Sequence, residues 1–135
     1  VNAFSPYNQY PLNIGIFGVN SSTTIANIKD GTTNVILVSE RRIFRTTTLN
    51  PLNPLNQVNR LRSSDGWAWG GPATIMSTRG APAKGDHYDE AASPHIDVVQ
   101  VALADGSVRQ ISVNVDLRTW RNLGNMANGT PLGEF

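Results

Sequence analysis

The dipeptide Asp105-Gly106 constrains the fold of this chain more than any other feature, because it lies between two apolar runs. Residues 96–104 and 107–113 both have the composition of short strands. Asp-Gly between two such runs is a strong local hairpin signal, since a type I′ turn needs positive φ at both central residues. We therefore predict an antiparallel hairpin closed by a two-residue turn.

The register of this hairpin follows from the length of the turn. A two-residue turn pairs Leu103 with Val108, and Val101 then faces Gln110. Apolar and polar residues do not alternate cleanly in this register. The prediction is therefore a hairpin with both faces partly covered.

The predicted elements before and after the hairpin complete an α+β fold. The sequence predicts a capped helical turn near 23–29 with Ser22 or Thr23 as its cap, a buried strand over 34–40 that 41–45 could extend, a short strand over 73–78, long loops over 46–65 and 79–94, and a helix over 115–123 capped by Asn114. We expect a mostly antiparallel sheet with a C-terminal Asp-Gly hairpin, two short helices and long loops. A length of 135 residues suits one globular domain, 1–135.

Composition excludes several functional classes. Eleven basic and ten acidic residues give a net charge of +1, which supplies no strong field for nucleic acid. The absence of cysteine excludes disulfides, thiolate metal sites and cysteine nucleophiles. No apolar run approaches the roughly 20 residues of a membrane helix. We expect no nucleic-acid partner, and membrane contact only through a missing N-terminal helix, if one existed.

His95 and Asp105 invite interpretation as a catalytic pair, but the expected strand between them argues against it. Ten extended residues span roughly 33 Å, so the two side chains lie at opposite ends of the strand. Asp105 is better explained by turn chemistry, and His95 by orienting a loop or packing on an aromatic ring. We predict no catalytic residue.

Glu40 ends the apolar strand and is followed by two arginines. We interpret it as a half-buried carboxylate paired with arginine or with backbone donors. The alternative role of general base lacks a nucleophile or a second carboxylate nearby in the sequence.

Several potential metal ligands cluster in the loop that ends near His95. They are His87, Asp89, Glu90, His95 and Asp97. Their spacing matches no metal motif, so we predict no metal site and no cofactor. Calcium is kept as an alternative ligand.

Two groups of apolar residues are candidates for a subunit interface. Trp67 and Trp69 share a parity, which places both rings on one face, where they would form core, interface or a stacking platform. Leu49, Leu52 and Leu55 lie in a proline-rich loop that cannot form a central strand. We take these five residues as candidate interface residues.

Several segments resemble one bacterial family in order and spacing. They are 28–40, which contains Asp30-Gly31 and ends at Glu40; His95 followed by nine residues and Asp105-Gly106; 115–121; 15–22; and 66–72. The pattern is similar to the globular part of a prepilin-like family of unknown function with a C-terminal H-x9-DG signature, related to type IV pilins and pseudopilins. The residues that carry the resemblance are His95, Asp105, Gly106, Asp30, Gly31 and Glu40.

This resemblance implies a pseudopilin-like domain that is exported to the cell envelope or the extracellular space. It implies a structural or assembly module rather than an enzyme, with protein partners in a filament, an envelope array or a larger complex. Self-assembly is one form of this expectation. The alternative is an extracellular domain that binds glycan or calcium, and a third is a hydrolase built on the loop near 86–97.

Overall fold

We describe the protein from a computed structural model that defines residues 15–17, 21–41, 44–47, 59–62, 76–82 and 91–135. The five candidate interface residues, Leu49, Leu52, Leu55, Trp67 and Trp69, lie outside these residues, as do His87, Asp89 and Glu90.

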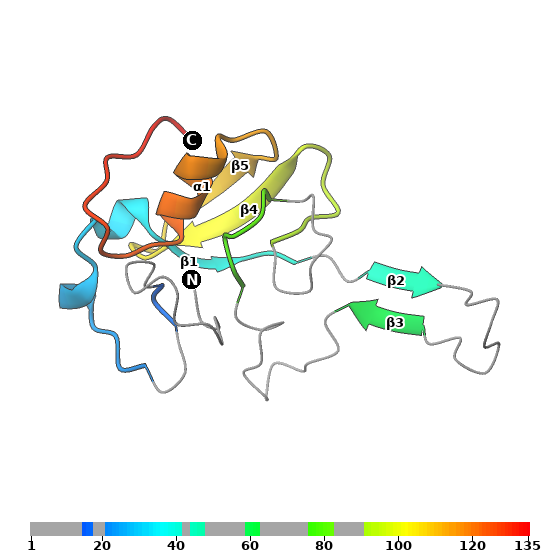
Figure 1. Cartoon of the computed structure of the whole chain (residues 1–135), viewed down its shortest axis with the longest axis horizontal. Helices are drawn as coiled ribbons and strands as arrows, with labels where there is room; N and C mark the ends of the chain where they lie inside the picture. Colours follow the sequence, from blue (N-terminus) through cyan, green and yellow to red (C-terminus); the bar gives the residue numbers. More distant parts are fainter. Residues whose placement is uncertain (1–14, 18–20, 42–43, 48–58, 63–75, 83–90) are drawn as a thin grey trace.

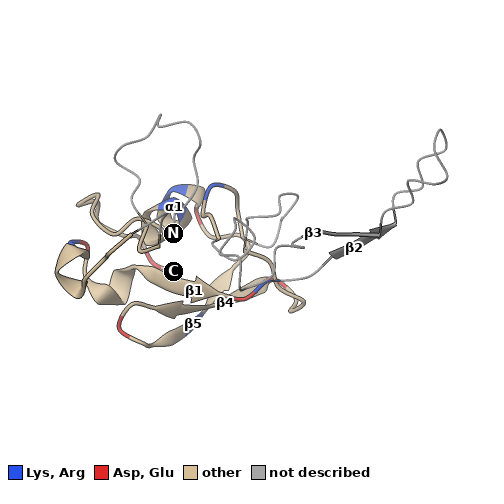
Figure 2. Cartoon of the chain, turned by 90° about the horizontal axis from the view of Figure 1, so that it is seen from below, with Lys and Arg blue, Asp and Glu red and all other residues tan. Residues whose placement is uncertain are grey.

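The main sheet has three antiparallel strands in the order β1-β4-β5 (Figure 1). These strands are β1 (Ile36–Ser39), β4 (Val98–Leu103) and β5 (Val108–Ser112). One α-helix, α1 (Leu117–Leu123), lies against one side of this sheet in both views (Figures 1 and 2). Two 3-10 helices, η1 (Ile25–Asn27) and η2 (Thr32–Asn34), precede β1. The described residues thus form a small α+β fold.

A second, two-stranded sheet departs from the sequence prediction. It pairs β2 (Phe44–Thr47) with β3 (Asn59–Arg62) in antiparallel fashion. The sequence predicted that residues 41–45 extend the preceding strand and that 46–65 are loop. The prolines that argued against a strand, Pro51 and Pro54, both precede β3, so they do not interrupt its ladder.

The hairpin forms where the sequence predicts it, but its turn is one residue longer. The Leu103 N–H donates to Ser107 O (2.8 Å), and the Gly106 N–H donates to Leu103 O (2.9 Å). In the turn only Gly106 has a positive φ, at 87°. These bonds enclose a three-residue loop, a type I turn followed by a glycine bulge, and not the predicted type I′ turn.

The longer turn shifts the register by one residue and removes the irregular alternation. Val101 lies opposite Arg109, and Gln100 opposite Gln110. A shift of one residue exchanges the two faces of a strand. The buried residues of the hairpin therefore share one face: Val99, Val101, Leu103 and Ile111.

The core lies between this face and α1. Trp120 and Leu123 of α1 are fully buried in one cluster with the strand residues, whereas Leu117 is 37% exposed. The helix is therefore buried at Trp120 and Leu123 and partly exposed at its first residue, Leu117. The N-cap is Asp116, whose carboxylate accepts from the Thr119 N–H at 2.9 Å, and not the predicted Asn114.

The predicted helix near 23–29 is shorter than expected. Only η1 forms there, and the residue before it is Thr24 rather than Ser22 or Thr23. The Asn27 side-chain oxygen accepts from both the Thr24 N–H (2.7 Å) and the Thr24 hydroxyl (2.8 Å). Side chains that bond to nearby backbone in this way favour turns over regular helix.

None of the helices in the described part of the chain is long and apolar enough to cross a membrane.

Candidate functional site

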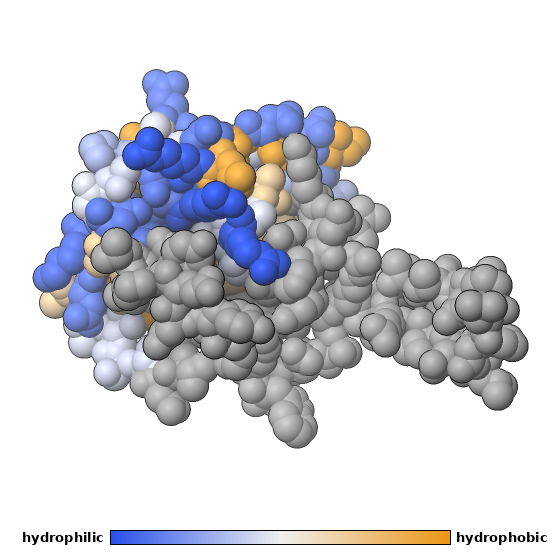
Figure 3. All heavy atoms as spheres, viewed as in Figure 1, coloured by the Kyte–Doolittle hydropathy of each residue, from blue (hydrophilic) through white to orange (hydrophobic). Residues whose placement is uncertain are grey.

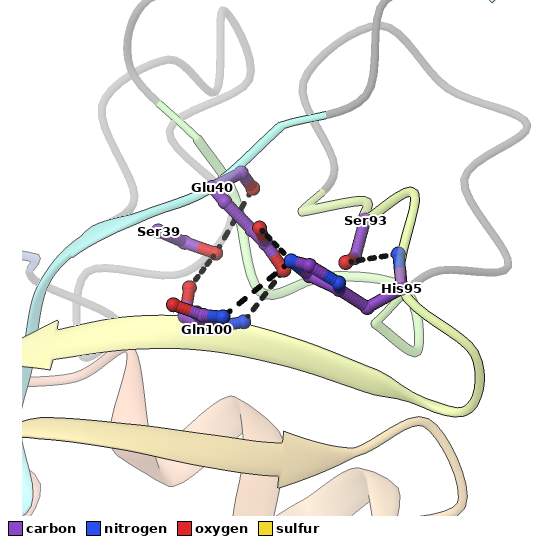
Figure 4. A network of polar contacts seen from close by, with 5 residues as sticks. All are labelled: Ser39, Glu40, Ser93, His95 and Gln100. Carbon is purple, nitrogen blue, oxygen red and sulfur yellow. Dashed lines mark hydrogen bonds and ion pairs between the residues drawn. The ribbon is translucent and has the colours of Figure 1, made fainter.

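A polar network closes one end of the β1–β4 pair (Figure 4). At the end of β1 the Glu40 N–H donates to Gln100 O (3.0 Å), as a ladder bond would. The return bond is different, because the Gln100 N–H donates to Glu40 Oε1 (2.8 Å). The carboxylate thus takes the position of a backbone carbonyl at the last rung of the sheet.

The hydroxyl of Ser39 completes this end of the ladder. It contacts Gln100 O at 3.3 Å and Glu40 O at 3.1 Å. The chain leaves the sheet at this point. The side chains of Ser39 and Glu40 provide hydrogen-bond partners for the backbone of β4 there.

His95 joins the network from the loop that precedes β4. Its Nε2 lies 3.6 Å from Glu40 Oε2 and 3.4 Å from Gln100 Nε2 (Figure 4). Its backbone N–H donates to the Ser93 hydroxyl at 2.9 Å, which fixes the loop. The His95 side chain is 52% exposed, so the contact with Glu40 is a surface contact of modest strength.

The opposite end of the β1–β4 pair holds the dipeptides Asp30-Gly31 and Asp105-Gly106. The Asp105 N–H donates to Thr32 O (3.1 Å), and the Ala104 N–H donates to Val35 O (2.8 Å). Asp105 Oδ1 accepts from the Ser107 N–H (2.9 Å) and from its hydroxyl (2.7 Å). These bonds, chiefly that from the Ser107 N–H, lower the pKa of the Asp105 carboxyl. Asp105 therefore stabilises the turn of the hairpin.

Asp30 holds the C-terminal segment against this end of the sheet. Its Oδ2 accepts from the Asn128 N–H (2.9 Å), and its Oδ1 accepts from the Gly129 N–H (2.8 Å). The following Gly31 has a φ of 90°, a conformation that only glycine adopts without strain. Asp30 is thus a clamp between residues nearly a hundred positions apart.

The structure therefore divides the six resemblance residues into two groups. Glu40 and His95 lie together at one end of the β1–β4 pair, and both Asp-Gly dipeptides lie at the other. His95 and Asp105 do not meet, as the length of the strand between them predicts. The sequence did not identify Gln100, Ser39 or Ser93 as members of the network. Nothing in their local sequence marks them, because Gln100 is 60 residues from Glu40.

Two observations on the described residues bear on the hydrolase and metal-site alternatives. The hydroxyls of Ser39 and Ser93 contact backbone atoms, so neither is presented to the His95 ring as a nucleophile. No three His, Cys, Asp or Glu side chains in this part of the chain are grouped to hold a metal ion.

The side of the sheet away from α1 carries exposed apolar residues. Val38 pairs with Ala102, and Ala102 pairs with Val108, so the three form one row across the strands. Val38 is 52% exposed and Val108 is 69% exposed. In Figure 2 no described element covers this side, which we call the open face. Figure 3 views the molecule from another side and shows mostly polar surface among the described atoms there, with small apolar areas.

The comparisons with known proteins give one match. Residues 6–118 match the model of a bacterial family described as "Protein of unknown function (DUF1559)". The chain has no significant match among curated proteins or solved structures. Because the family model spans most of the chain, the protein is a member of the DUF1559 family.

Proposed function

We propose that this domain is an exported, pilin-like structural or assembly module that acts through protein–protein contacts. The observation that carries the proposal is the open face of the sheet, with its row of Val38, Ala102 and Val108. Its partner is another protein of a filament, an envelope array or a larger complex, or further copies of this chain.

The residues around this row support a protein partner over a small ligand. The row is followed on β4 and β5 by Gln100 and Gln110, which are paired and uncharged. An exposed apolar row bordered by amide side chains resembles a protein interface, which is depleted in charge at its centre. A small-molecule site would instead be concave and enclose most of its ligand.

The polar network at Glu40 supports a structural role for the residues most suggestive of chemistry. Glu40 and His95 are a carboxylate and an imidazole in contact, both of them groups that acid–base catalysis uses. The Glu40 carboxylate already accepts a backbone bond of the sheet, and a general base must instead face its substrate. Export and a pilin-like role rest on the resemblance of the sequence segments.

A charge placed on the open face tests the proposal. Val38→Glu buries a carboxylate in any contact made through this face, so we expect at least a tenfold weaker assembly. Ile25→Glu is the matched control, because Ile25 is 75% exposed and lies on η1 rather than on the sheet. The readout is the particle mass by size-exclusion chromatography with light scattering. Equal assembly of Val38→Glu and the wild type would refute a role for this face.

A further inference from the structure

We infer that the free edge of β5 pairs with β5 of a second copy of this chain, antiparallel, about a two-fold axis at Gln110. The inference rests on the proposed function and specifies one contact through which copies assemble. The result would be a continuous sheet of six strands.

The hydrogen bonds of the hairpin decide which backbone groups of β5 are free. The Leu103 N–H donates to Ser107 O, and the Val113 N–H donates to Asp97 O. Because bonded and non-bonded pairs alternate along an antiparallel ladder, odd-numbered residues of β5 bond to β4. The backbone groups of Val108, Gln110 and Ser112 therefore point away from the sheet.

Little within the described structure satisfies these groups. β5 is the last strand of the sheet. Ser112 O accepts from the Val115 N–H at 3.1 Å, and a carbonyl can accept a second bond. The outward N–H groups of Val108 and Gln110 have no partner among the described residues.

The two edges of the sheet differ in how they are protected. β1 has an irregular register between Ile36 and Val38, and such a bulge hinders pairing with another strand. β5 is regular and contains neither proline nor lysine. Its one charge, Arg109, lies over the Phe135 ring at 5.2 Å, on the core side of the sheet. β5 thus lacks the usual features that prevent edge pairing.

For two copies of β5, charge and strand overlap together select a single register. With the axis at Gln110, Val108 faces Ser112 of the other copy, and Arg109 faces the uncharged Ile111. All three outward residues of each strand then form bonded pairs, about six hydrogen bonds in total. An axis at Arg109 would place two arginines opposite each other, which is unfavourable. An axis at Ile111 would leave Val108 outside the strand–strand overlap.

Cysteine cross-linking tests the register, because the chain has no cysteine of its own. Bonded antiparallel pairs have Cα atoms about 5.5 Å apart, within the range that a disulfide bridges. We expect Gln110→Cys to give a disulfide-linked dimer under mild oxidation. Val108→Cys and Ser112→Cys should each form no disulfide with itself, since four residues, about 13 Å, separate each position from its counterpart. Mixed together, these two variants should cross-link to each other.

The background is set by Ile25→Cys, at an exposed position on η1 rather than on the sheet. Cross-linking of Gln110→Cys no faster than this background would overturn the inference, as would equally fast cross-linking of Val108→Cys with itself. A second test needs no oxidation. Gln110→Pro removes an outward N–H and leaves the β4–β5 ladder intact, so it should abolish any concentration-dependent dimer of the wild type.

The outcomes separate this inference from the proposed function. Native particles much larger than one chain, without specific cross-linking at Gln110, would overturn the β5 contact and leave the assembly function standing. A monomeric native particle would instead overturn the assembly function itself.

Discussion

Glu40 Oε1 accepts the backbone N–H of Gln100 at 2.8 Å, so a carboxylate side chain replaces a main-chain carbonyl at the last rung of the β1–β4 ladder. The same carboxylate lies 3.6 Å from His95. One side chain thus ends a strand and ties the loop before β4 to it. Glu40 therefore has a structural role at the end of the sheet.

Substitution of Glu40 separates this role from a simple charge effect. Glu40→Ala leaves the Gln100 N–H without its acceptor, and we expect a loss of about 1–3 kcal/mol in the free energy of unfolding. Glu40→Gln keeps an oxygen acceptor and should lose about half as much, because charge-assisted bonds are roughly twice as strong as neutral ones. Urea unfolding measures both. Equal losses for the two variants would contradict the assignment.

The Asp30 clamp should control the local stability of the C-terminal segment. Asp30→Ala removes the acceptors of the Asn128 and Gly129 N–H groups, so both amides should exchange with solvent at least tenfold faster. Hydrogen exchange followed by NMR reports each amide separately. Asp97→Asn is the control, since it removes the same charge elsewhere and Asn tolerates the positive φ of 58° found there. Unchanged exchange in Asp30→Ala would show that the clamp does not hold the segment.

Asp116 gives the fold an acid-sensitive element. The Thr119 N–H lowers the pKa of its carboxyl, partly offset by desolvation. A carboxyl with a lowered pKa in the folded state contributes stability above its ordinary titration range and loses it as pH falls through the lowered pKa. Asp116→Asn retains a capping oxygen but does not titrate.

The stability of Asp116→Asn should therefore fall less steeply than that of the wild type between pH 7 and about pH 3. Chemical unfolding at the two pH values gives the comparison. Asp105, whose pKa is also lowered, is present in both proteins, so its contribution to the pH dependence of stability cancels in the comparison. Parallel losses of stability in the two proteins would contradict the assignment of the cap.

Gly124, the residue that follows α1, must be a glycine because it is closely packed. Its φ of −84° suits any residue, but a Cβ there would overlap the buried Thr78 side chain and lie 2.9 Å from Thr78 Cβ. Gly124→Ala should cost about 1–3 kcal/mol in the free energy of unfolding, and adding Thr78→Ala should recover part of it. Gly133→Ala, whose nearest contact would be 3.3 Å, is the control. Thermal or urea unfolding of the wild type and the three variants measures these differences in the free energy of unfolding.

The sequence predicted elements better than it predicted their details. The 96–113 hairpin was predictable because Asp-Gly between apolar runs is a local signal. The register was not, because two- and three-residue turns differ in the φ of Asp105, which the dipeptide itself does not determine. Likewise Asn114 and Asp116 are both good caps, and only the structure distinguishes them.

In the candidate site, too, the sequence predicted the role of a residue but not its partner. The sequence predicted that Glu40 pairs with arginine or with backbone donors, and the structure shows a backbone donor. That the donor belongs to Gln100, on a strand far along the chain, depends on tertiary pairing. The same holds for the clamp between Asp30 and the tail, where two exposed-looking segments meet.

The mass of the native particle, measured by size-exclusion chromatography with light scattering on protein taken from its source, tests the assembly function most directly. The account predicts a mass many times that of one chain, with co-eluting chains that identify the assembly. A mass equal to one chain at all accessible concentrations would contradict it.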